Sequence, residues 1–193
     1  MEDSDFKRLL GFFPQVQLTE EQRTTFRTLW TVRTYARSEF ITEAGQTERY
    51  FYFALQGVQA IYVLNDRGEK VVLGFSYSGS PSGVFDSFIA QTPSNTFLEA
   101  LKPSKLLAIS LRDYQSLFQL FPGFDCWGHH FFRDMLFGRL FREVELLTLS
   151  AEARYTTFLK RCPAELKVIP QKYLASYLNM KPETFSRLRS SVR

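Results

Sequence analysis

Six polar side chains near the C-terminal end of the chain have the types and spacing needed to bind nucleic acid. Arg187 can donate two hydrogen bonds to a guanine edge, and Glu183 can accept one from a cytosine amine. The types of side chain that bind phosphate groups occur at Lys181, Thr184, Ser186 and Arg189. The segment therefore predicts a surface for double-stranded DNA, in which some residues read bases and others hold the backbone.

Two short helices joined by a tight turn would place these side chains on one surface. In IPQKYLASYLNMKPETFSRLRSSVR, an apolar helix face is formed by Tyr173, Leu174, Tyr177 and Leu178. Ala175 is small enough for a second helix to come close, and Asn179 tolerates a left-handed backbone at the turn. A second helix would begin at Pro182 and turn Phe185 and Leu188 inward. This order predicts a helix-turn-helix; the alternative is a basic amphipathic hairpin that only solvates the chain end.

The charge distribution agrees with an anionic partner for this end of the chain. Residues 151–193 hold nine Lys or Arg and three Asp or Glu, whereas residues 1–150 hold 15 and 17. A basic C-terminal piece on a faintly acidic body is therefore expected to attract an anion such as DNA. Charge alone would fit a solvated face equally well, so the prediction depends on the motif.

Short strands are predicted for the region before the helices, from about residue 33 to residue 110. Runs rich in Val, Ile, Tyr and Phe are separated by Gly45, Gly57, Gly68 and Gly79. The segment LNDRGEK, between two such runs, has the residues of a β-hairpin turn. This pattern favours an antiparallel sandwich or barrel, interrupted by one short helix within SGVFDSFIAQTPS. Before it, residues 3–32 are predicted to be helical, with a capping box at Thr19 and Gln22.

One long helix is predicted from residue 125 to residue 147. An apolar seam recurs every three to four residues at Phe132, Leu136, Leu140, Val144 and Leu147. Because other apolar residues lie around the same helix, we expect one side to meet the barrel and the other to meet a second copy of the chain. The alternative is an ordinary core helix in a monomer.

The order of these elements resembles the bacterial cyclic-AMP receptor and fumarate/nitrate-reduction (Crp/Fnr) regulators, in the short version common in Bacteroidetes. The likeness covers nearly the whole chain and includes LQG after an aromatic strand, the long helix and the segment PQKYLASYLNMKPETFSRLR. Within that segment, ETFSR matches the recognition-helix pattern of the family. Many members have a basic residue just before the Glu, where this chain has Pro182 and so lacks one base-reading side chain.

The resemblance implies an α+β fold in three parts. Residues 1–123 would form a sensor domain, with an N-terminal double-stranded β-helix (a jelly roll like that of cyclic-nucleotide-binding domains) and flanking helices. Residues 124–149 would form a dimerisation helix, and residues 150–193 a small helical helix-turn-helix domain. The implied function is that of a homodimeric, sequence-specific transcriptional regulator, in which DNA contacts fall on Glu183, Thr184, Ser186 and Arg187. RNA polymerase is a candidate partner.

Members of the family that bind cyclic nucleotides use a cassette with an acidic residue for the ribose and an Arg for the phosphate. The matching stretch here, residues 83–100, offers polar or aromatic side chains at Phe85, Asp86, Ser87, Phe88, Ser94, Asn95 and Thr96. No Lys or Arg lies between Lys70 and Lys102, and a buried phosphate without a cation is costly. We therefore expect a degenerate cassette, no cofactor and no cyclic AMP. A neutral or apolar ligand could lie against Phe85, Phe88 and Ile89, or these rings could simply fill the barrel.

Other classes of function are disfavoured. The chain has two distant cysteines and two adjacent histidines, which are too few or badly spaced for a metal centre. There is no nucleophile–base constellation, so an enzyme is not expected. The N-terminus lacks the apolar stretch of a signal peptide, and no run of 18 apolar residues occurs; a cytoplasmic protein without membrane contact is predicted. The competing hypothesis is a ligand-binding sensor that acts through a protein partner and keeps a vestigial DNA-binding motif.

Overall fold

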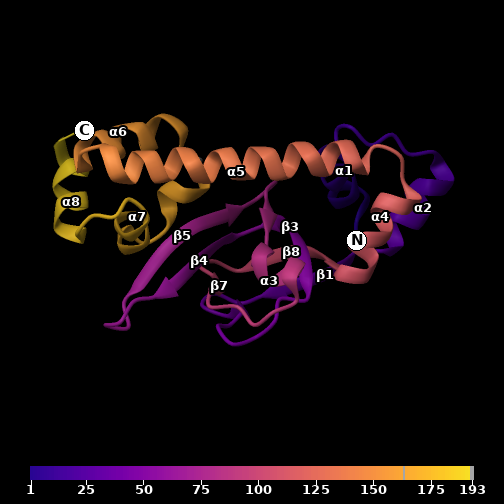
Figure 1. Ribbon diagram of the computed structural model, residues 1–193, viewed down its shortest axis with the longest axis horizontal. Helices are drawn as coiled ribbons and strands as arrows, with labels where there is room; N and C mark the ends of the chain where they lie inside the picture. Colours follow the sequence, from indigo (N-terminus) through magenta and orange to yellow (C-terminus); the bar gives the residue numbers. More distant parts are fainter. Residues whose placement is uncertain (163, 192–193) are drawn as a thin grey trace.

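The computed structural model describes residues 1–162 and 164–191, which form a β-roll beneath one long helix, with groups of helices at both ends (Figure 1). The helices are α1 (Asp3–Gly11), α2 (Glu20–Thr28), α3 (Phe85–Ala90), α4 (Leu111–Leu120), α5 (Phe124–Thr148), α6 (Ala151–Arg161), α7 (Gln171–Tyr177) and α8 (Pro182–Ser191), with the 3-10 helix η1 (Ala164–Val168) between α6 and α7. The strands are β1 (Thr31–Tyr35), β2 (Phe40–Thr42), β3 (Tyr50–Gln56), β4 (Val58–Leu64), β5 (Lys70–Tyr77), β6 (Pro81–Ser82), β7 (Phe97–Ala100) and β8 (Ser104–Ser110).

The strands pair into two antiparallel sheets of four strands each. The first sheet has the order β1-β8-β3-β6 and the second has the order β2-β7-β4-β5. The predicted hairpin joins β4 to β5, and Gly68 takes a φ of 74° in its turn, a value that suits glycine. In the second sheet β5 is an edge strand, so one side of its backbone is open to a partner outside the sheet.

An aromatic core joins the first sheet to the N-terminal helices. Along β3, Phe51 and Phe53 are buried in this core, whereas Tyr52 and Ala54 belong to a separate cluster, as the two-residue period of a strand requires. The core also contains residues of α1, α2, α4 and the first turn of α5. Many of the aromatic side chains of the chain lie in this core. Because Phe124 and Trp127 are among them, the start of α5 is packed firmly against the roll.

A second cluster joins the second sheet to the C-terminal helices. It contains Val58, Ala60, Tyr62 and Val72 from the roll, and buried residues from α6, α7 and α8. In Figure 1, α7 accordingly lies beside β4 and β5, below the last turns of α5. We call this shared region the junction.

The α+β class, the roll, the long helix and the terminal helix pair agree with the sequence predictions. Residues 3–32 were expected to be helical, but α1 and α2 are separate helices and β1 already begins at Thr31, because residues 12–19 form a turn and a capped start. The predicted capping box at Thr19 is present. Helix α6 is capped at its start by the side chain of Ser150. Among the described residues, no helix has the length and apolar character needed to span a bilayer.

Candidate nucleic-acid interface and ligand pocket

Helices α7 and α8 form the helix-turn-helix that the sequence predicts. Asn179 has a φ of 49°, the left-handed conformation expected at the turn. Ala175 is fully buried and accepts a hydrogen bond from the amide of Met180 at 3.0 Å, which brings the two helices together. Phe185 is buried and packs edge-on against Tyr155 of α6, with ring centroids 5.4 Å apart. The first of the two helices begins at Gln171, with Pro170 as its N-cap.

The outer face of α8 carries polar side chains that have no partners among the described residues. Glu183, Ser186 and Arg187 are exposed, and Thr184 is half-buried. At about 100° per residue, these four positions share roughly half of the circumference of the helix, opposite Phe185. Within the described residues, no ion pair or side-chain hydrogen bond engages them. Lys181 is also exposed, just before the helix begins. Such a face is free to bind another molecule.

Arg189 lies apart from that face. By helical geometry it lies about 120° or more from Glu183 and Arg187, nearer to Phe185. It instead lines a cleft between α8 and the roll, together with Arg37 and Lys102. The structure therefore groups Glu183, Thr184, Ser186 and Arg187 on one face of α8 and places Arg189 on another side.

Ser176 of α7 holds the open edge of the second sheet. Its hydroxyl donates to the carbonyl of Lys70 at 2.8 Å and accepts from the amide of Val72 at 3.0 Å. One side chain therefore satisfies two backbone groups of β5 that would otherwise have no partner in the sheet. The helix-turn-helix is thus attached to the roll by hydrogen bonds as well as by apolar packing.

An ion pair lies at the edge of the junction. Lys70 of β5 bonds to the buried carboxylate of Glu99 of β7, and its ammonium lies 4.4 Å from the ring centre of Tyr62. The hydroxyl of Tyr173 comes within 3.4 Å of the same carboxylate. Burial is the largest single influence on the pKa of Lys70 and opposes its charge. The hydrogen bonds to Glu99 and Tyr62 and the nearby charge of Glu99 together outweigh burial, so the pKa of Lys70 is raised above its ordinary value.

Two arginines hold the turn of the helix-turn-helix, and no local pattern in the sequence points to either of them. Arg154 of α6 donates to the carbonyls of Leu178 and Asn179 at 2.9 and 3.0 Å. Arg142 of α5 donates to the carbonyl of Tyr177 at 2.7 Å and also reaches the carbonyl of Val72 at 3.3 Å. The carbonyls of Tyr177, Leu178 and Asn179 lie at the C-terminal end of α7, where cations are favoured. The long helix therefore contacts the roll and the helix-turn-helix through one side chain.

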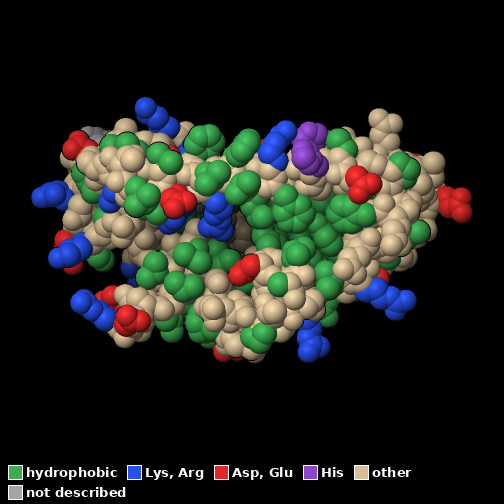
Figure 2. Space-filling view, in the orientation of Figure 1, with side chains coloured by type: hydrophobic (Ala, Val, Ile, Leu, Met, Phe, Trp, Pro, Cys, Tyr) green, Lys and Arg blue, Asp and Glu red, His purple; other side chains and the backbone are tan. Residues whose placement is uncertain are grey.

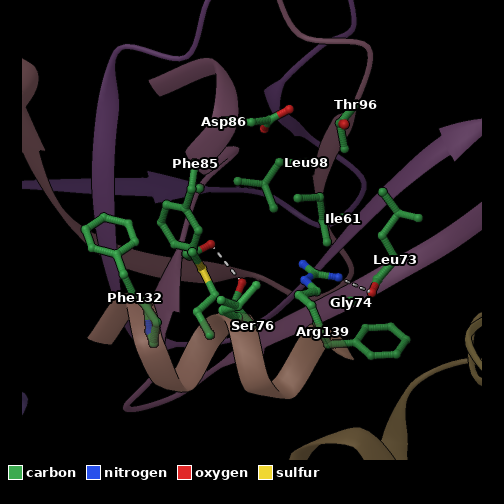
Figure 3. Close-up of a pocket in the computed structure, with 16 residues that line it drawn as sticks. Ile61, Leu73, Gly74, Ser76, Phe85, Asp86, Thr96, Leu98, Phe132 and Arg139 are labelled. Carbon is green, nitrogen blue, oxygen red and sulfur yellow. Dashed lines mark hydrogen bonds between the residues drawn. The ribbon is translucent and has the colours of Figure 1, made fainter. Parts of the chain in front are cut away.

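A pocket of about 560 Å³ lies between the roll and α5. Figure 2 shows hydrophobic side chains along α5 and in the hollow beneath it. In Figure 3, Ile61, Phe85 and Leu98 lie on the roll side, while Phe132 and Arg139 come from α5. Arg139 donates to the carbonyl of Leu73 at 2.9 Å. Arg139 therefore places a cation at the pocket, although the cassette segment itself contains none. The sequence of the cassette segment could not show this, because Arg139 belongs to a distant part of the chain.

The predicted pocket residues divide into two groups. Phe85, Asp86 and Thr96 line the pocket. The other side chains are used elsewhere: Phe88 is buried in the aromatic core, and Ser87 bonds the amide of Glu48 at 3.0 Å. Ser94 accepts from the amide of Thr96 at 2.8 Å. Asn95 and Ile89 are exposed and do not line the pocket.

An apolar stripe on α5 is exposed. The predicted seam residues have exposed fractions of 36% at Phe132, 56% at Leu136, 48% at Leu140, 57% at Val144 and 78% at Leu147. Phe137 and Phe141 add two exposed rings to the same helix. At about 1.5 Å per residue, the stripe from Phe132 to Leu147 is about 22 Å long. A surface of this kind marks an interaction site.

Comparison with known proteins identifies the roll. Residues 32–120 match the family model of the cyclic nucleotide-binding domain. No curated protein sequence is similar enough to the chain to count as a relative.

Solved structures share the fold over most of the chain. A mutant of CooA from Carboxydothermus hydrogenoformans has a TM-score of 0.69 and 17% identity, over 90% of this chain and 80% of that one. FixK2 from Bradyrhizobium japonicum has a TM-score of 0.68 and 18% identity, over 84% of both chains. A protein from Eubacterium rectale, described as a transcriptional regulator of the crp/fnr family, has a TM-score of 0.67 and 13% identity, over 90% of this chain and 83% of that one. At these identities the likeness establishes the fold.

Proposed function

Because the chain carries a cyclic nucleotide-binding domain and has the fold of Crp/Fnr-type regulators, we propose that it is a homodimeric, sequence-specific DNA-binding transcriptional regulator. The observation that carries the proposal is the outer face of α8. Its polar side chains have no partners among the described residues, yet the helix is held firmly from behind by Phe185 and the junction. A rigid helix with an unpaired polar face suits insertion into a major groove.

The proposed dimer pairs two copies of α5. The exposed seam repeats every three to four residues, as helices that pack side by side require. Self-association through one stripe gives a two-fold axis, and the same axis would set the two copies of α8 against symmetric half-sites. The occupant of the stripe is therefore a second copy of the chain.

Two arginines of α5 offer a route from the pocket to the DNA-binding helices. Arg139 touches the pocket and bonds Leu73, and Arg142, one turn later, bonds Val72 and Tyr177. A ligand that shifts α5 against β5 would change both contacts at once. The proposed mechanism is a change in the angle of the long helices that resets the spacing of the two recognition helices.

The pocket does not fit a cyclic nucleotide well. Asp86 is the only charged side chain that the cassette segment contributes to the pocket, and it would repel a phosphate. Arg139 is exposed and already bonded to Leu73. The cassette is therefore proposed to be degenerate, and the largely apolar lining favours a neutral or apolar effector if one is used.

The first test is selection of bound duplexes from a random pool, with no ligand added. Enrichment of a two-fold symmetric site is expected. Arg187→Ala should then relax discrimination at one base pair by about 1–3 kcal/mol, whereas Lys181→Ala should weaken all duplexes alike. If Arg187→Ala binds every duplex as the parent does, the assignment of α8 is wrong.

A second test addresses the dimer and the competing hypothesis of a sensor that acts through a protein partner. Sedimentation of the parent should give a dimer, and Leu140→Glu, at a half-exposed position that need not disturb the fold, should give a folded monomer. Binding of duplex by the parent should weaken steeply with salt, because phosphate contacts release counterions. A parent that stays monomeric and binds no duplex at low salt would favour the competing hypothesis.

A further inference from the structure

A second cleft, of about 640 Å³, lies on another side of the molecule, between the roll and the helix-turn-helix. Four cations line it: Arg37, Lys102, Lys167 and Arg189. They come from four separate segments, namely the turn after β1, the turn after β7, η1 and α8. None of these residues lines the pocket under α5 or lies on the outer face of α8, and Arg189 is the one predicted DNA contact that lies apart from that face.

Within the described part of the chain, the charged residues that line the cleft are all positive. No Asp or Glu is among the described residues that line the cleft. Within residues 1–162 and 164–191, none of the four forms an ion pair. Like charges gathered in a concave site raise each other's energy, and an anion that enters the site relieves this repulsion. The cleft is therefore electrostatically prepared for a multiply charged anion.

The walls of the cleft are fixed in place. Ala100 accepts from the amide of Ser38 at 2.7 Å and donates to the carbonyl of Glu39 at 2.9 Å, which holds the Arg37 turn beside the Lys102 turn. Leu101 donates from its amide to Val58 at 2.8 Å. On the opposite wall, Ile169 is buried in the same apolar cluster as Leu101. A site with rigid walls loses little conformational freedom when a ligand binds.

We propose that this cleft binds a small molecule that carries two or more adjacent phosphates. Its volume lies within the usual range of about 300–1,000 Å³ for small-molecule sites. Arginine and lysine are the residues that bind phosphate best, and Leu101, Ile169 and two prolines give the cleft an apolar part for a ring or alkyl group. A concave cleft suits a compact ligand better than the convex edge of a duplex.

The proposed site has a consequence that depends on the proposed function. A ligand here joins the roll to α8 through Arg189, and it engages a cation that could otherwise contact the DNA backbone. Occupation of the cleft should therefore weaken duplex binding.

The test uses inorganic pyrophosphate as the probe, titrated into the full chain by calorimetry at constant ionic strength. One pyrophosphate should bind per chain, and the double variant Arg37→Ala/Lys102→Ala should weaken it at least tenfold. The matched control is Lys7→Ala, which removes an exposed positive charge on α1, at the other end of the molecule. Circular dichroism checks that the double variant is folded; if it is not, Lys167→Ala, which changes an exposed side chain of the cleft, takes its place.

The outcomes separate the cleft from the proposed function. Absence of pyrophosphate binding, or equal weakening by Lys7→Ala and the double variant, overturns the cleft proposal even if the duplex selection succeeds. A second outcome also overturns the cleft proposal: the parent binds no pyrophosphate, and the double variant loses affinity for duplex. The cleft would then be a contact surface for the DNA backbone. Pyrophosphate binding that depends on Arg37 and Lys102 supports the cleft even if no operator is found.

Discussion

Alternate residues of β4 face two different environments. Val58, Ala60 and Tyr62 lie in the junction, where they are buried in one apolar cluster with residues of the C-terminal helices. Gln59 and Ile61 face the other way. Gln59 bonds Ser104 at 2.8 Å and accepts from Ser76 at 2.9 Å, and both Ser76 and Ile61 line the pocket. One strand thus separates a closely packed, closed region from an open pocket.

This difference assigns separate tasks to the two sides of the second sheet. On the junction side, removal of any large side chain leaves a cavity, so the helix-turn-helix is held in one arrangement. On the pocket side, hydroxyl and amide groups can exchange partners with a ligand at small cost. The arginines of α5 touch both sides, so a change in the pocket is expected to reach the junction through Arg142 rather than through the sheet.

The largest expected effect comes from opening the junction. Tyr173→Ala should destabilise the protein by about 3–5 kcal/mol, because Tyr173 is 7% exposed and its removal leaves a cavity beside the Lys70–Glu99 pair. Urea unfolding measures the change. Tyr173→Phe is the control and should differ from the parent by less than about 1 kcal/mol, since the hydroxyl contacts at 3.4 and 3.5 Å are long. A loss below 1 kcal/mol for the alanine variant would show that the junction is not closely packed.

A smaller effect is expected where α5 meets both regions. Arg142→Ala removes two charge-assisted hydrogen bonds and a contact with the ring of Tyr177, 4.4 Å from its centre. The loss should be about 1.5–3 kcal/mol. Arg139→Ala, on the exposed pocket side, should cost less than about 1 kcal/mol. Equal costs in urea unfolding would remove the distinction between the two arginines.

Local patterns made the helix-turn-helix predictable. Within 25 residues, Ala175, Asn179 and Phe185 stand where helix packing and the turn require small, left-handed and apolar residues. The long helix was predictable for the same reason, because its period is visible in the sequence. The N-terminal region was less predictable. The helical spacing of its apolar residues does not show that residues 12–19 are non-helical and separate α1 from α2.

Contacts between distant segments were not predictable. Ser176 meets backbone groups more than 100 residues earlier in the chain, and no local pattern selects that partner. The pocket gives the clearest example. The lack of cations between Lys70 and Lys102 was read correctly from the sequence, but Arg139 enters the pocket from α5, and only the packing of α5 on the roll reveals it.

The hydrogen bonds of Ser176 test whether the edge of β5 depends on α7. Ser176→Ala should cost about 1–2 kcal/mol, because it leaves the amide of Val72 and the carbonyl of Lys70 without their shared partner. Faster hydrogen exchange at the amide of Val72 should accompany the loss. Ser190→Ala is the control, since that exposed hydroxyl bonds only within α8, and it should change stability by less than about 0.5 kcal/mol. Unchanged exchange at Val72 would contradict the role of Ser176.

The smallest expected effect concerns a buried acid in the polar part of the roll. Burial raises the pKa of Glu48 above its ordinary value of 4.5, although Thr42 and the amides of Tyr50 and Arg49 donate hydrogen bonds to its carboxylate. A folded-state pKa above the unfolded value means that the folded protein holds this proton more tightly. The contribution to stability is therefore complete below about pH 4.5 and is lost as the pH rises through the folded-state pKa.

Glu48→Gln isolates this effect. The amide keeps one oxygen for the two backbone amides, and its nitrogen can donate to Thr42, so the hydrogen bonds are retained without the charge. Melting temperatures measured from pH 4 to pH 8 should show the parent losing stability relative to the variant as the pH rises. If the parent instead gains stability relative to the variant over this range, the hydrogen bonds to the carboxylate outweigh the effect of its burial. The interior of the roll around Glu48 would then stabilise a single negative charge, whereas at the junction the buried carboxylate of Glu99 is paired with Lys70.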